Sequence, residues 1–187
     1  MDALFVSTLA VAVAEIGDKT QLLALLLAAR YRRPWPILAG ILLATLLNHA
    51  LAAWFGAALS EWLPAGLLRA LVAASFVAVA LWTLRPDRLD ETDRPRAQGG
   101  AFLTTTLAFF LAEIGDKTQV ATVLLAARFD ALGPVIAGTT LGMLLANLPV
   151  VLLGARFADR LPLRAARLAA ALLFLLLAGW VALRGIG

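Results

Sequence analysis

One seven-residue sequence with three charged side chains occurs twice in this chain. Glu-Ile-Gly-Asp-Lys-Thr-Gln stands at 15–21 and again at 113–119. Each copy lies inside an apolar run long enough to cross a bilayer, and ionisable groups at that depth are costly and mark an ion or substrate path. The doubled motif therefore predicts a membrane transporter with a paired acidic site.

The side-chain oxygens of the two motifs are ligands that hard divalent cations prefer. On a regular helix, the Glu and Asp of each motif share one face, and the Gln continues that face one turn later. Carboxylates with amide oxygens favour Ca²⁺, Mn²⁺ or Mg²⁺ over soft metals. We predict metal ligands at Glu15, Asp18, Gln21, Glu113, Asp116 and Gln119.

The remaining polar residues of the motifs have several predicted roles. Thr20 and Thr118 can add hydroxyl oxygens to the site. Lys19 and Lys117 can compensate charge or gate the site. Since each lysine follows its own motif's glutamate by four positions, structural salt bridges within each motif are the alternative.

Each motif also contains a glycine between its two carboxylates. Gly17 and Gly115 permit either a local break in the helix or a close approach between helices. Either arrangement would expose backbone carbonyls to an ion.

The charges of the two motifs do not cancel. Four carboxylates and two lysines leave two uncompensated negative charges, and an ionised site of that kind is expensive to bury. One divalent cation neutralises it, and so do two protons. This balance motivates the hypothesis that a divalent cation exchanges for protons or for another cation.

The elements that must carry these motifs are membrane spans. The chain has 187 residues, of which 62% are hydrophobic and only 15% charged, and it has no cysteine, which excludes disulfides and thiol catalysis. Six apolar segments have the length of a bilayer-spanning helix. They lie at 3–29, 36–58, 65–84, 101–127, 133–155 and 164–184.

The two halves of the chain match at a constant offset of 98 residues, the separation of Glu15 and Glu113. With three spans per repeat, the second copy must enter the membrane from the opposite side, as in many secondary transporters. We therefore predict an all-α membrane protein of six transmembrane helices in two inverted three-helix repeats. Residues 1–84 form the first repeat, 85–100 a linker and 101–187 the second repeat.

Arginine in the loops predicts the orientation. Eleven arginines lie on the side of the 85–100 linker and three on the other. The positive-inside rule then makes the linker cytoplasmic and places both termini outside. This basicity is a topology signal, so we expect a lipid bilayer and no nucleic acid as partner.

Three polar residues of the second and fifth spans are weaker candidates. His49 and Asn147 are mates under the repeat, and Asn48 stands beside His49. They can line the ion path or form hydrogen bonds between helices, because polar side chains commonly join membrane helices.

The doubled Glu-x-Gly-Asp-Lys-Thr motif in two three-helix halves resembles uncharacterised protein family 0016, the GDT1/TMEM165 family. The resemblance covers essentially the whole chain. It implies transport of Mn²⁺ and Ca²⁺, by proton antiport, and similarity to bacterial manganese exporters of the inner membrane. It also implies Glu15, Asp18, Glu113 and Asp116 as the metal residues, with no prosthetic group.

Three other functions are alternatives for such a chain. A six-helix exporter of small organic cations, such as basic amino acids, has a similar size. A membrane enzyme is disfavoured because no nucleophile or interfacial His/Ser cluster accompanies the motifs. A scaffold subunit would not need symmetric buried charges. The predicted ligand types do not favour Mn²⁺ over Ca²⁺. No feature of the sequence indicates the oligomeric state.

Overall fold

A computed structural model describes residues 2–86, 99–154 and 162–185. Most of the predicted linker 85–100, the basic loop after the fifth span and both chain ends lie outside these described residues. The described part of the chain is entirely helical. Its helices are α1 (Asp2–Glu15), α2 (Lys19–Tyr31), α3 (Pro34–Trp62), α4 (Ala65–Thr83), α5 (Ala101–Glu113), α6 (Lys117–Phe129), α7 (Leu132–Leu153) and α9 (Leu163–Arg184).

Four of these helices match single predicted spans. The helices α3, α4, α7 and α9 have 19 to 29 residues and are apolar enough to cross a membrane. Many large apolar side chains on the outer surface are exposed, among them Trp62 and Leu183. Such a surface suits lipid rather than water, and the chain is a membrane protein.

The predicted first and fourth spans are not continuous helices, and in this respect the prediction was wrong. Each is divided at its motif into two helices of 13 or 14 residues, α1 with α2 and α5 with α6. Each half-helix is about 20 Å long at 1.5 Å per residue, which is shorter than a bilayer's apolar core. The predicted alternative, a local break at each glycine, is confirmed.

Backbone geometry explains where these helices stop. Gly17 and Gly115 have φ angles of +80° and +75°, in the left-handed region that glycine enters without steric cost. The next residue, Asp18 or Asp116, is extended and forms the N-cap of the following helix. Asp18 accepts a hydrogen bond from the Thr20 backbone N–H at 3.4 Å, so the aspartate both ends the break and starts the new helix.

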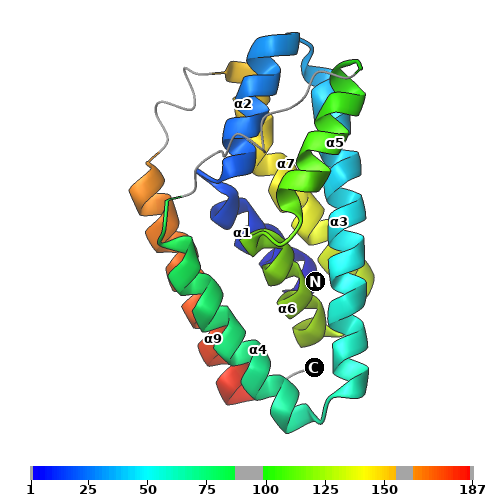
Figure 1. Ribbon diagram of the computed structural model, residues 1–187. Helices are drawn as coiled ribbons and strands as arrows, with labels where there is room; N and C mark the ends of the chain where they lie inside the picture. Colours follow the sequence, from blue (N-terminus) through cyan, green and yellow to red (C-terminus); the bar gives the residue numbers. More distant parts are fainter. Residues whose placement is uncertain (1, 87–98, 155–161, 186–187) are drawn as a thin grey trace.

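The two halves of the chain interlock (Figure 1). The long helix α3 of the first half packs against α5 and α6 of the second, and α7 of the second half packs against α1 and α2 of the first. The remaining pair, α4 and α9, lies side by side at the lower left of Figure 1, with Phe76 stacked on Phe174. This packing brings both helix breaks to the middle of the bundle.

Glycines allow the close approach of several of these helices. A Cβ atom at Gly142 of α7 would lie 2.6 Å from the Thr8 carbonyl oxygen of α1, and one at Gly56 of α3 would collide with the Val123 carbonyl oxygen of α6. Small residues of this kind let membrane helices pack backbone to backbone.

We expect Gly142→Ala to destabilise the protein by about 1–3 kcal/mol, the usual penalty of overpacking. The added methyl group meets the backbone of Thr8, which cannot rotate away. The measurement is the thermal unfolding midpoint in detergent. Gly179→Ala in α9 is the matched control, because no neighbouring helix within residues 2–86, 99–154 and 162–185 comes within 4 Å of its Cβ position. Equal midpoints for the two variants would contradict the packing argument.

We also expect Gly115→Ala to lower stability, by about 1–2 kcal/mol, because a left-handed residue with a Cβ atom is strained. No neighbour in the part of the chain that the structure describes lies within 4 Å of that Cβ position, so the effect isolates the backbone conformation. Gly115→Asn should be milder, since asparagine tolerates this region. Thermal unfolding midpoints again provide the comparison, and an alanine variant as stable as the asparagine variant would refute the assignment of strain.

Candidate functional site

The two helix breaks bring the four predicted carboxylates together in the core. Glu15 and Glu113 end α1 and α5, while Asp18 and Asp116 begin α2 and α6. Glu15, Asp18 and Glu113 are completely buried, and Asp116 is 4% exposed. The four acidic residues thus lie together in the buried interior, where the two helix breaks meet.

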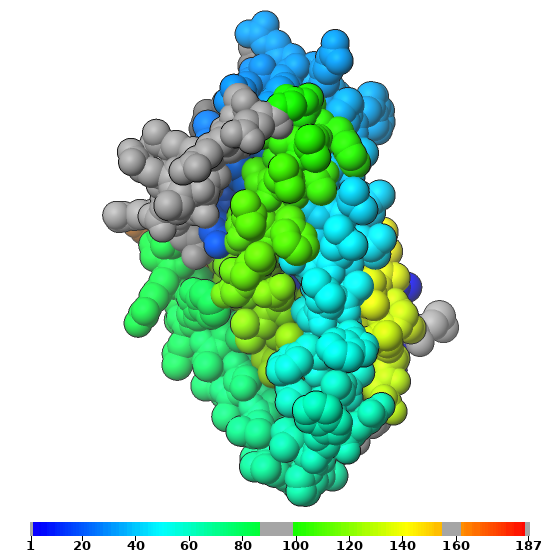
Figure 2. Space-filling model, turned by 45° about the vertical axis from the view of Figure 1, so that its right-hand side comes forward, coloured from blue at the N-terminus to red at the C-terminus, as the bar shows by residue number. Residues whose placement is uncertain are grey.

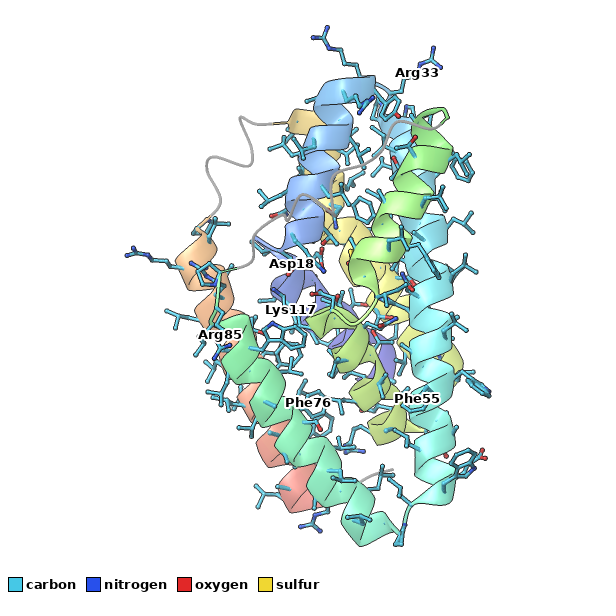
Figure 3. All side chains as sticks on the ribbon, in the orientation of Figure 1. Asp18, Arg33, Phe55, Phe76, Arg85 and Lys117 are labelled. Atoms are coloured by element: carbon cyan, nitrogen blue, oxygen red, sulfur yellow. The ribbon has the colours of Figure 1, made fainter. Side chains whose placement is uncertain are left out.

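Each lysine pairs with the aspartate of the other motif. Lys117 of α6 forms an ion pair with Asp18 of α2 (Figure 3). Lys19 Nζ lies 3.9 Å from Asp116 Oδ1. The alternative of salt bridges within each motif was wrong, because the helix break separates each lysine from its own motif's glutamate. The lysines therefore join the two halves of the chain.

The threonines of the motifs direct their hydroxyl groups to the carboxylates. Thr20 Oγ1 donates to Asp18 Oδ2 at 3.3 Å. Thr118 Oγ1 lies 2.9 Å from Glu113 Oε2 and 3.3 Å from Asp116 Oδ2. A hydroxyl carries one proton, so Thr118 can donate to only one of these two carboxylates at a time.

The two glutamates are the least compensated members of the site. Both carboxyl oxygens of Glu15 and Oε1 of Glu113 are buried without a hydrogen-bond partner among the described residues. A buried ionised carboxylate without a partner is very costly. These glutamates therefore need a proton or a bound cation, whereas the aspartates already have lysines.

The glutamines brace the helix breaks. Gln21 Oε1 accepts a hydrogen bond from the Gly17 backbone N–H at 2.8 Å, and Gln119 Oε1 accepts one from the Gly115 N–H at 2.7 Å. The oxygen predicted to bind metal thus satisfies a backbone donor that the break leaves free. Sequence reasoning missed this role, although the spacing of four residues from glycine to glutamine is its signal.

The pathway candidates lie on α3 and α7. Asn48 Nδ2 donates to the Phe110 carbonyl oxygen of α5 at 3.0 Å, a hydrogen bond between helices. Asn147 Nδ2 donates within its own helix to the Met143 carbonyl oxygen at 3.1 Å. His49 is buried, and neither ring nitrogen has a hydrogen-bond partner among the described residues.

The carboxylates do not form a closed metal cage in this conformation. Within residues 2–86, 99–154 and 162–185, no three His, Asp or Glu side chains converge closely enough to hold a metal ion. The lysines explain part of this arrangement, because each one already pairs with an aspartate. In this conformation the lysines compensate the charge of the two aspartates.

Comparison with known proteins connects this site to a family. The sequence model of the family described as divalent cation/proton antiporter GDT1 matches residues 3–91 and 101–187. A Vibrio cholerae serotype O1 protein named "Putative manganese exporter" is 55% identical over 179 residues, which are 95% of this chain and 89% of that protein.

A second relative is more distant. A GDT1-like protein of Synechocystis is 29% identical over 194 aligned positions, covering 91% of each chain. No solved structure matches this chain significantly. The family match extends over both motif-bearing halves, and the chain belongs to the GDT1 family of divalent cation/proton antiporters.

Proposed function

We propose that this protein exports Mn²⁺ from the cytoplasm in exchange for protons, at a site made by Glu15, Asp18, Glu113 and Asp116. One observation carries the proposal: two completely buried glutamates, neither of which forms an ion pair among the described residues, stand beside two aspartates that are paired with lysines. The site is therefore short of two positive charges. Two protons on the glutamates supply them, and so does one divalent cation.

The packing of the halves supports the predicted architecture of six crossings in two inverted repeats. Each broken pair, α1 with α2 and α5 with α6, has the combined length of one span. The reciprocal packing of α3 on the second half and of α7 on the first is what a two-fold relation between repeats requires. Discontinuous helices that meet near the midplane are a common site for ions in such transporters.

The direction and the cation rest on separate arguments. The arginine-rich loops favour a cytoplasmic linker and outward-facing termini, and the likeness to bacterial manganese exporters favours the inner membrane as the location. The name of the Vibrio relative supports Mn²⁺ as the cation to test first. Oxygen ligands also accept Ca²⁺, so Ca²⁺ belongs in the same assay as a competitor.

We expect Glu15→Gln and Glu113→Gln each to reduce Mn²⁺ flux in proteoliposomes to the level of protein-free vesicles. An amide cannot exchange a proton for a cation, but it preserves shape and removes an uncompensated buried acid. The thermal unfolding midpoint should therefore equal or exceed that of the unmodified protein.

The control for these variants is Glu61→Gln, which removes an exposed carboxylate near the end of α3. Its flux should match that of the unmodified protein. Transport that survives in both buried variants would remove the glutamates from the site. Unfolding of both would instead indicate a structural role.

The charge balance predicts an electroneutral exchange of one divalent cation for two protons. A pH gradient should drive Mn²⁺ across proteoliposome membranes, and a K⁺ diffusion potential set with valinomycin should leave the initial rate unchanged. A different stoichiometry moves net charge, and each elementary charge gains about 2.3 kcal/mol per 100 mV. A rate that depends on the potential would therefore contradict the two-proton count.

A further inference from the structure

The two motifs have the same seven residues but different surroundings. The Lys117–Asp18 pair is buried, with side chains 3% and 0% exposed. The Lys19–Asp116 pair is stretched to 3.9 Å, and the Lys19 side chain is 21% exposed. One cross-motif ion pair is thus closed, and the other is partly open.

Neighbouring helices show the same asymmetry. At the first motif, a Cβ on Gly17 would lie 2.8 Å from Leu163 Cδ2 of α9, whereas none of the described residues comes within 4 Å of the Cβ position at Gly115. Gln21 Nε2 donates to the Ala146 carbonyl oxygen of α7 at 3.0 Å, which ties α2 to that helix. The first motif is therefore covered as well as ion-paired.

The second motif borders a hollow instead. Gln119 lines a space of about 250 Å³ between α3 and α6. The other lining residues are Leu51, Ala52, Phe55, Val120 and Val123. Figure 2 shows the face on which α6 lies between α3 and α4, and Figure 3 places Phe55 beside the lower part of α6.

A lysine and a metal ion compete for the same aspartate. The ammonium group is a compact cation with donors only, on a flexible stem. While it holds a carboxylate, a divalent cation cannot take that oxygen as a full ligand. Displacing the ammonium group frees the ligand without leaving the carboxylate uncompensated, because the metal replaces its charge.

We propose that Lys19 and Lys117 are tethered counter-cations that close the two motifs in turn, each on the aspartate of the other motif. In the conformation described, Lys117 closes the first motif on Asp18, while the looser Lys19 leaves Asp116 for an arriving divalent cation. The exchanged arrangement, with Lys19 closed on Asp116, is the opposite state of the transport cycle. This inference rests on the proposed function.

The first test compares the Mn²⁺ affinities of the purified lysine variants with that of the unmodified protein. Electron paramagnetic resonance measures the concentration of free Mn²⁺. A lysine that holds its aspartate in nine molecules out of ten weakens apparent affinity about tenfold. The Lys117→Gln variant should therefore bind Mn²⁺ about tenfold more tightly than the unmodified protein. Its rate of Mn²⁺ transport should fall, because the bound ion is released more slowly. Lys117→Arg keeps the cation and should restore affinity to within about twofold of the unmodified protein.

The repeat provides a matched variant. Lys19→Gln removes the corresponding charge from the looser pair and should tighten binding less than Lys117→Gln. A general electrostatic effect of removing one positive charge would shift both affinities equally, and that result would overturn the gating role. An unchanged or weaker affinity in Lys117→Gln would overturn it as well.

A second measurement does not depend on the variants. Lys19 and Lys117 are the only lysines in the chain, so amine-reactive labelling followed by mass spectrometry reports directly on both. Without metal, Lys19 should label faster than Lys117. Saturating Mn²⁺ should raise the rate at Lys117 by displacing it from Asp18. Unchanged or slower labelling of Lys117 with Mn²⁺ would overturn the inference.

These outcomes separate the inference from the function on which it rests. Failure of the unmodified protein to bind or transport any divalent cation would defeat the proposed function, and the inference with it. Mn²⁺ transport that is intact, together with a Lys117→Gln variant of unchanged affinity, would defeat the inference alone. The double variant Glu15→Gln/Glu113→Gln is the labelling control, because its lysine rates should not respond to Mn²⁺.

Discussion

Burying four carboxylates in an apolar bundle is the constraint on which the rest of this structure depends. An ionised acid in a low-dielectric core is tolerated only with a partner. The protein meets this demand unevenly. Each aspartate is paired with a lysine, whereas neither glutamate forms an ion pair among the described residues. The uneven compensation separates two aspartates that have a lysine partner from two glutamates that need a proton or a metal ion.

The helix breaks help to make that burial possible. A helix N-terminus carries partial positive charge and free N–H groups. The helices α2 and α6 both begin at their motifs, so two such termini face the acidic group, with Asp18 and Asp116 as the N-caps. A continuous helix would offer neither the partial positive charge nor the free N–H groups at this depth. The glutamines then satisfy the glycine N–H groups at each break, so the unusual backbone leaves few free donors.

Sequence reasoning predicted the membrane class, the six apolar segments and the acidic residues of the site. It placed Glu15 and Asp18 on one regular helix, and the structure places them on two. Hydropathy sums over some twenty residues and does not register one glycine at positive φ, so a broken span and an unbroken span look alike. The wrong assumption of continuity also produced the wrong lysine partners, because spacing of four residues implies contact only within a helix.

By itself, the sequence determined the chemical types at the site, their duplication and their net charge, since these follow from composition and order. Only the tertiary structure decided that Lys117 pairs with Asp18 and that two identical motifs have unequal surroundings. Those contacts come from helices far apart in the chain, such as α9 over Gly17 and α7 beside Gln21. Local sequence is the same in both motifs, so any difference between them must come from packing.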